Sequence, residues 1–95
     1  MPIFYKGDVQ SVSQVTGFDW TSQTAKEVTI LNPDQTKTTY TGANVVVDDN
    51  VTGTIHVVHT MAQVGKHLMQ AKLTVNTVIK FGPVTDFVVS NPLSA

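Results

Sequence analysis

Apolar and polar residues alternate with a period of two along most of the chain. In the segment AKEVTIL, Val28 and Ile30 fall on one side of an extended backbone, and Glu27 and Thr29 fall on the other. This is the pattern of a half-buried β-strand. It predicts a strand over residues 25–31 that directs Val28 and Ile30 into the core.

Six more segments are predicted to be extended, from their alternation or from the Val and Thr residues that are abundant in the chain and suit a pleated surface. They cover residues 8–16, 36–41, 43–49, 52–59, 66–75 and 85–90. No segment has a convincing helical period. About seven short strands separated by turn signals favour an all-β fold: one immunoglobulin-like antiparallel β-sandwich domain over residues 1–95, with a short extended N-terminal segment and a C-terminal tail. The cysteine pair and the core tryptophan of antibody domains are missing from the pattern, so this prediction rests on the architecture alone.

The alternation also assigns side chains to faces. The side chains expected in the core are Ile55, Val57, His59, His67, Met69, Ala71, Leu73, Val75, Phe87 and Val89. Those expected to point outward are His56, Val58, Lys66, Leu68, Gln70, Lys72 and Thr74. Phe18 and Trp20 are expected to fold back over one end of the core. Residues 60–65 break the alternation, which predicts either a single helical turn or a crossover between two sheets.

The segment LNPDQTKTTY contains the sharpest local signal. Pro33 presets φ for the first central position of a type I turn, Asn32 is favoured before it, and Asp34 can bond back to the backbone. The alternative is that Asp34 marks the corner of an ion or ligand site. Turn chemistry explains the same residues, so we predict a hairpin here and a second turn over residues 48–53.

Charge and composition exclude several classes of function. The chain has six Lys plus Arg, seven Asp plus Glu and a formal net charge of -1, with no basic run that could pair with phosphates, so nucleic acid is not an expected partner. No apolar run approaches the length of a membrane helix, and the first residues lack the pattern of a signal peptide. The absence of cysteine favours folding in the cytoplasm.

The sequence signals for a metal site or an active site are weak. His56 and His59 point to opposite faces of one strand, and His59 and His67 are expected to meet only if their strands are neighbours. Asp34, Asp48, Asp49 and Asn50 lack the spacing of a calcium loop. No serine lies in the sequence context of a nucleophile elbow, and no glycine-rich loop precedes a helix to bind phosphate. For acid–base catalysis, Glu27 or an Asp would have to lie in a pocket. We therefore expect no metal, no cofactor, no catalytic residue and no enzymatic activity.

Four aromatic residues are the candidate protein-interface residues. They are Phe4, Tyr5, Tyr40 and Phe81. Aromatic side chains are enriched where proteins dock. The alternative is that these residues cap the two ends of the sandwich.

Several short motifs resemble one known family. FYKGD at residues 4–8, NPDQT at 32–36, the Thr-rich segment after it and VGKHLMQAKL at 64–73 resemble the immunoglobulin-like N-terminal domain of phage baseplate upper proteins and its small single-domain relatives. The chain departs from that pattern at Gln35, where glycine is usual, and at His67, where an aromatic residue is usual. The first change weakens a turn that prefers a positive φ, and the second makes a core position less apolar.

The resemblance implies a bacteriophage virion protein that is assembled in the host cytoplasm. It would be an adaptor or connector that links tail, baseplate or neck components to fibres through sheet faces and edge strands, present in multiple copies in a symmetric assembly of virion proteins. An alternative within the virion is a capsid or tube decoration protein. An alternative of another class is a carbohydrate-binding β-sandwich module.

Overall fold

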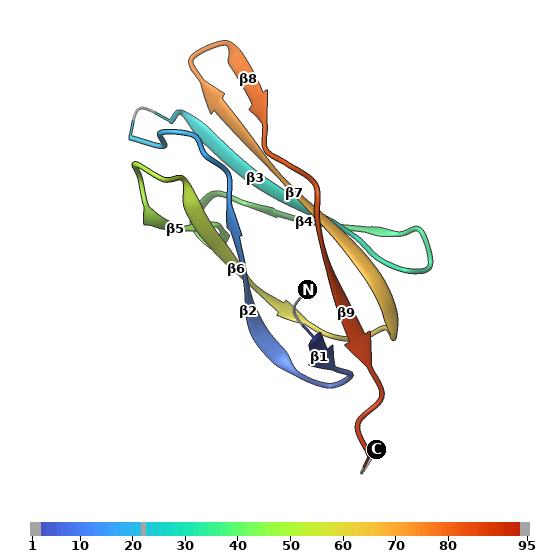
Figure 1. The fold of residues 1–95 in the computed structure, drawn as a ribbon. Helices are drawn as coiled ribbons and strands as arrows, with labels where there is room; N and C mark the ends of the chain where they lie inside the picture. Colours follow the sequence, from blue (N-terminus) through green and yellow to red (C-terminus); the bar gives the residue numbers. More distant parts are fainter. Residues whose placement is uncertain (1–2, 22, 94–95) are drawn as a thin grey trace.

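The computed structural model describes residues 3–21 and 23–93, which form two packed β-sheets (Figure 1). Within these ranges the strands are β1 (Ile3–Tyr5), β2 (Val9–Val15), β3 (Ala25–Leu31), β4 (Lys37–Thr41), β5 (Val46–Asp49), β6 (Thr54–Thr60), β7 (Gly65–Val75), β8 (Val78–Phe81) and β9 (Thr85–Ser90). Sheet A has the order β1-β9-β7-β3-β4, with β8 also paired to β7, and sheet B has the order β2-β6-β5. The all-β sandwich is therefore confirmed.

All seven predicted strands are present, and two more accompany them. β1 has only three residues, which is too short for alternation to be read, and all four residues of β8 are exposed, so β8 has no buried face to produce a pattern. The predicted strand over residues 43–49 begins too early. Gly42–Asn44 form a 3-10 turn, in which the Val45 N–H donates to the Gly42 carbonyl at 3.1 Å, and the strand starts at Val46.

The core lies between the two sheets. Its buried apolar residues are Val12, Trp20, Val28, Ile30, Val45, Ile55, Val57, Met61, Met69, Ala71, Leu73, Phe87 and Val89. The predicted inward faces of β3, β6, β7 and β9 are confirmed by this set together with the buried His59 and His67, except that Val75 is only partly buried. Residues 61–64 contain no helical turn and carry the chain from β6 in sheet B to β7 in sheet A, so the crossover is confirmed.

A buried tryptophan is present after all. Trp20 is 1% exposed, and it comes from the loop between β2 and β3 rather than from a strand. Its indole Nε1–H donates to the Thr16 hydroxyl at 2.8 Å, and that hydroxyl donates to the Gly53 carbonyl at 2.9 Å. The buried indole N–H is thereby satisfied, and the loop is tied to the turn between β5 and β6.

The predicted hairpin at residues 32–35 is confirmed. The Asn32 carbonyl accepts from the Gln35 N–H at 3.0 Å, and the Asp34 carboxylate accepts from the Thr36 N–H at 3.0 Å. Gln35 has a φ of 73°, in the left-handed region that favours glycine. Gln35 therefore has a strained backbone conformation, because its side chain disfavours a positive φ.

Replacing Gln35 with glycine is expected to raise the free energy of unfolding by about 0.5–1 kcal/mol. Relief of the left-handed strain exceeds the extra backbone entropy that glycine gives the unfolded chain. Urea denaturation would measure the change, with Gln35→Ala as the control because alanine keeps the strain. Equal or lower stability of the glycine variant relative to the natural chain would contradict this account.

The predicted tail lies partly outside the described residues. β9 ends at Ser90, and residues 91–93 follow without regular secondary structure. Residues 1, 2, 94 and 95 of the predicted terminal segments lie outside the described ranges.

Candidate protein-interaction surface

The side of sheet A that faces away from the core is the candidate functional surface. We call it the outer face of sheet A. Its side chains come mainly from β3, β4 and β7 and alternate with core residues such as Val28 and Met69. They include Glu27, Thr29, Leu31, Lys37, Thr39, Thr41, Lys66, Leu68, Gln70, Lys72 and Thr74. In the described residues no second layer covers this face (Figure 1).

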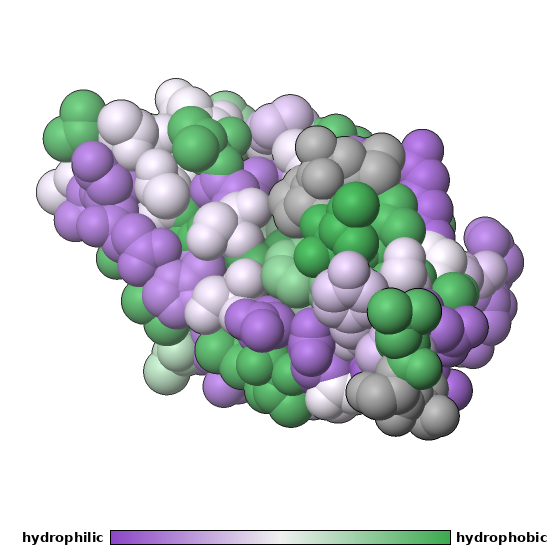
Figure 2. Space-filling view, turned by 60° about the horizontal axis from the view of Figure 1, so that its bottom comes forward, coloured by the Kyte–Doolittle hydropathy of each residue, from purple (hydrophilic) through white to green (hydrophobic). Residues whose placement is uncertain are grey.

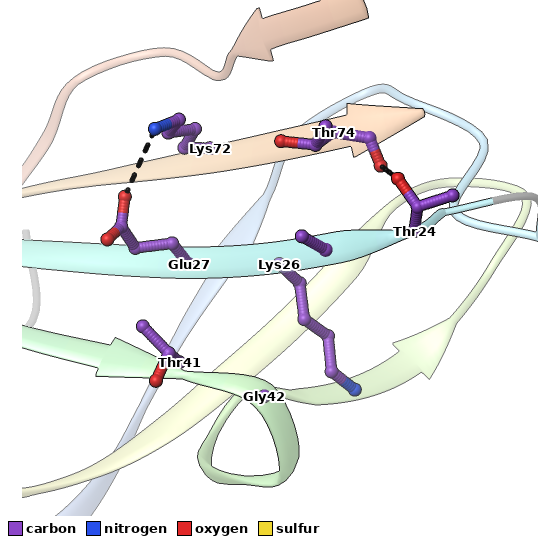
Figure 3. Close-up of a pocket in the computed structure, with 8 residues that line it drawn as sticks. Thr24, Lys26, Glu27, Thr41, Gly42, Lys72 and Thr74 are labelled. Atoms are coloured by element: carbon purple, nitrogen blue, oxygen red, sulfur yellow. Dashed lines mark hydrogen bonds and ion pairs between the residues drawn. The ribbon is translucent and has the colours of Figure 1, made fainter. Parts of the chain in front are cut away.

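One end of the outer face is hollowed into an open depression of about 320 Å³ (Figure 3). Glu27 on β3 and Lys72 on β7 point toward each other there, with 3.8 Å between Oε2 and Nζ. The Thr24 hydroxyl donates to the Thr74 carbonyl at 3.0 Å, and Lys26 points away from the Glu27–Lys72 pair. The depression offers one carboxylate, which is already paired, and therefore not the two carboxylates that glycoside hydrolysis needs.

A second depression, of about 210 Å³, lies farther along the same face. Leu31, Leu68 and Val84 supply apolar atoms to it, and Thr29 and Gln70 supply polar ones. The outer face therefore mixes apolar hollows with hydroxyl and amide groups. Such a surface suits a protein partner, because a docked chain can bury the apolar atoms and satisfy the polar ones.

The four candidate interface aromatics fall into two pairs. Phe4 packs edge-to-face on Phe87 with 5.6 Å between ring centroids, and Tyr40 packs in the same way near His59. Tyr5 is 50% exposed and Phe81 is 61% exposed. Phe4 and Tyr40 therefore support the core, whereas Tyr5 and Phe81 are accessible, and an interface role stays a prediction for all four.

Tyr5 and Phe81 lie at opposite ends of the outer face of sheet A. Tyr5 pairs with Ser90 beyond one end of β7, and Phe81 pairs with Lys72 near the other end. Each has an exposed aliphatic neighbour on the same side of the sheet, which is Ile3 beside Tyr5 and Ile79 beside Phe81. On the face seen in Figure 2, hydrophobic residues form separate patches with hydrophilic residues between them.

The exposed aliphatic residues of β8 were missed at the sequence level. Val78 is 56% exposed and Ile79 is 53% exposed. The signal that could have indicated them is the segment VIKF itself, which places apolar residues at consecutive positions without alternation. β8 has apolar residues on both of its sides, and all four of its residues are exposed, so the hairpin of β7 and β8 exposes apolar side chains.

The arrangement of the three histidines confirms one expectation and corrects another. His56 and His59 point to opposite faces of β6, as predicted, and His56 Nδ1 lies 2.7 Å from Asp48 Oδ2 on the outer side of sheet B. His59 and His67 do meet, with 6.0 Å between ring centroids, although β6 and β7 belong to different sheets. The expectation that they need neighbouring strands is wrong, because inner-face side chains of two packed sheets meet across the core.

Burial sets the protonation of this histidine pair. His67 is 0% exposed and stacks on Phe87, and its Nε2 has no hydrogen-bond partner in the described residues. His59 Nδ1 lies 2.6 Å from the Tyr40 hydroxyl. Desolvation lowers the pKa of both histidines below the ordinary value of 6.5, and for His59 the neighbouring His67 lowers the pKa further. Burial raises the pKa of Tyr40.

Two of the acidic residues considered for calcium, Asp34 and Asp49, hold turns, whereas Asp48 pairs with His56. Asp49 accepts from the Val51 and Thr52 N–H groups at 2.9 and 3.3 Å, and Asp34 accepts from Thr36. The hydrogen bonds from Thr36 lower the pKa of Asp34, and the bond from the Thr36 hydroxyl is the main cause. Among the described residues, no group of three or more His, Asp or Glu side chains is placed to hold a metal ion.

Comparison with known proteins does not place the chain in a family. No protein-family model matches it, and no curated protein matches it. In residues 3–21 and 23–93 no helix has the length and apolar character needed to cross a membrane.

Proposed function

We propose that this protein is a bacteriophage virion structural protein, an adaptor that joins tail, baseplate or neck components to fibres through its sheet faces and edge strands. The observation that carries the proposal is the outer face of sheet A. This face is uncovered and ends in exposed apolar residues at both ends, with Tyr5 and Ile3 at one end and Phe81 and Ile79 at the other. Two separated anchors on a rigid sheet suit a part that bridges two neighbours without catalysing a reaction.

The strand order supports an immunoglobulin-like topology. Sheet B has the order β2-β6-β5, and sheet A contains β9-β7-β3-β4. If the strands other than β8 are lettered A to G in chain order, with β4 as C′, these sheets are B-E-D and G-F-C-C′, the grouping of an immunoglobulin sandwich. β1 departs from the constant-type arrangement, because it pairs in parallel with β9 instead of joining sheet B.

The motif residues behind the phage resemblance have structural roles that support it. Gly7 has a φ of 97° in the turn after β1, where a side chain would be strained. Gly65 has a φ of 132°, and a Cβ there would lie 3.0 Å from Cγ of Pro33, so the start of β7 packs directly on the Pro33–Asp34 turn. The spacing of these motifs is thus explained by contacts within the fold.

The proposal predicts that the protein is a component of purified phage particles. Mass spectrometry of gradient-purified particles is expected to detect it together with tail, neck or baseplate proteins, and Phe81→Ser is expected to lower its copy number several-fold by removing an anchor. Val51→Ser is the matched control, because Val51 is 77% exposed but lies in the turn between β5 and β6, which are strands of sheet B. Particles that lack the protein although infected cells contain it would refute the proposal.

Two further measurements separate the alternatives. Immunogold labelling over the capsid or along the tail tube, rather than at a junction, would indicate a decoration protein. Binding of the isolated protein to a glycan array would indicate a carbohydrate module. A hydrolase activity lost on changing Glu27 or Asp34 would overturn every non-enzymatic assignment.

A further inference from the structure

β2 is an edge strand without the usual protection against pairing. It has seven residues, VQSVSQV, with no charged residue and no proline, and its pairing with β6 shows no register shift. Edge strands are normally kept from pairing by charges, by bulges or by being short. A long uncharged edge of this kind is suited to receiving another strand.

The other sheet edges in residues 3–21 and 23–93 carry such protection. β1 has three residues, and β8 has four, one of which is Lys80. β4 begins with Lys37. β5 contains Asp48 and Asp49 and has an irregularity between Val47 and Asp49. The lack of protection at β2 is therefore specific to this strand.

The backbone groups of β2 that face the free edge can be assigned. The Thr16 N–H donates to the Gly53 carbonyl, and the Met61 N–H donates to the Asp8 carbonyl. Hydrogen-bonded pairs alternate along an antiparallel ladder, so the even-numbered residues of β2 bond to β6. Val9, Ser11, Ser13 and Val15 then direct their N–H and C=O groups to the open side, and in the described residues these groups have no hydrogen-bond partner outside the ladder.

The sequence of β2 reads the same in both directions. VQSVSQV is a palindrome centred on Val12. In antiparallel pairing between two copies, with Val12 opposite Val12, every residue faces a residue of its own type: Val9 faces Val15, Gln10 faces Gln14 and Ser11 faces Ser13. The open-edge residues all fall at hydrogen-bonded positions in this register, which gives about eight hydrogen bonds between the copies.

Gln14 provides a second, independent indication that β2 pairs with another copy of itself. Its side chain is 3% exposed, and its Nε2 donates to the Pro83 carbonyl at 2.8 Å and to the Thr85 hydroxyl at 2.9 Å. Its Oε1 is buried and has no hydrogen-bond partner in the described part of the chain. An unpaired buried acceptor is costly, and the two-fold register brings the donor amide of Gln10 from the second copy to the position opposite Gln14.

We propose that β2 pairs with β2 of a second copy of this chain, antiparallel about a two-fold axis at Val12, to form one continuous sheet β5-β6-β2-β2-β6-β5. The interface is isologous, as most homodimer contacts are. The contact is only one strand wide and about 24 Å long, so association is weak and depends on concentration. The proposal does not rest on a virion role, and either can fail without the other.

A charge-swap series tests both the dimer and its register. In sedimentation velocity over a range of concentrations, the mass of the natural chain is expected to rise from 10.3 kDa toward twice that value. The S11K/S13K variant places lysine opposite lysine at both exposed serine pairs and is expected to remain monomeric. The S11E/S13K variant places Glu opposite Lys in the proposed register and is expected to restore the dimer. A natural chain that stays monomeric at millimolar concentration, or a S11E/S13K variant that stays monomeric beside a dimeric natural chain, would overturn the proposal.

Cysteine cross-linking gives a test that does not depend on charge. The chain contains no cysteine, so introduced thiols react without background. A mixture of S11C and S13C chains places the two thiols directly opposite each other, whereas either variant alone places them diagonally. The mixture is expected to form disulfide-linked dimers several-fold faster than either variant alone. Equal rates in all three samples would overturn the register.

Discussion

Replacing Gly53 with alanine is expected to lower the free energy of unfolding by about 3 kcal/mol. Gly53 has a φ of 71°, which costs any other residue about 1 kcal/mol. An added Cβ would also overlap the Thr16 hydroxyl and the backbone of Phe18, whose amide nitrogen would lie only 2.9 Å away. Overpacking of this kind typically costs about 1–3 kcal/mol, because backbone cannot move aside as a flexible side chain can.

Gly42→Ala is the matched control. Gly42 also has a positive φ, of 59°, but a Cβ there would meet nothing within 4 Å. Its substitution measures the backbone strain alone, at about 1 kcal/mol. Urea unfolding, with Trp20 fluorescence as the reporter, compares the two variants. Equal losses would show that the packing around Thr16 and Phe18 does not depend on Gly53.

Acidification is expected to destabilise the protein through the buried histidine pair. Desolvation lowers the pKa of His59 and His67 in the folded protein, so below about pH 6.5 the unfolded chain binds protons that the folded chain does not. The free energy of unfolding therefore falls as pH decreases from about 6.5 and goes on falling until the folded pKa values are reached. Thermal melts at a series of pH values between 7.5 and 5 would measure the loss.

His67→Phe is expected to flatten this pH dependence. Phenylalanine can keep the stack on Phe87, and it removes the titrating ring nitrogens, both the unpaired Nε2 and the Nδ1 that lies 3.2 Å from the Gly65 carbonyl. His56→Gln is the control, because His56 lies on the outer side of sheet B and pairs with Asp48. A pH profile that His67→Phe leaves unchanged, or that His56→Gln flattens instead, would contradict the role of the buried pair.

Much of the fold could be predicted from the sequence, because period two is a strong signal wherever one face of a strand is buried. β3, β6, β7 and β9 show this, since each buries alternate residues. β8 could not be predicted, because all four of its residues are exposed. Local turn chemistry was equally informative at Pro33 and Asp34, where the interactions lie within a few residues.

Contacts between distant segments could not be predicted in the same way. The meeting of His59 and His67 depends on how two sheets stack, which no local pattern encodes. Trp20 was expected over one end of the core, but the hydroxyl of Thr16 and the bend at Gly53 bring its indole inside. Of the four candidate interface aromatics, sequence could not separate Tyr5 and Phe81 from the more buried Phe4 and Tyr40, because burial depends on the neighbouring sheet.

The parallel pairing of β1 with β9 has a mechanical consequence. Ile3, Phe4 and Tyr5 lie beside Val88, Val89 and Ser90 in the same direction, so the N-terminal side of β1 and the C-terminal side of β9 point to opposite ends of the ladder. Tension between the two ends of the chain would pull these strands past each other. Their hydrogen bonds would then carry the load together in shear instead of opening one at a time, which makes this short ladder a mechanical clamp for the domain.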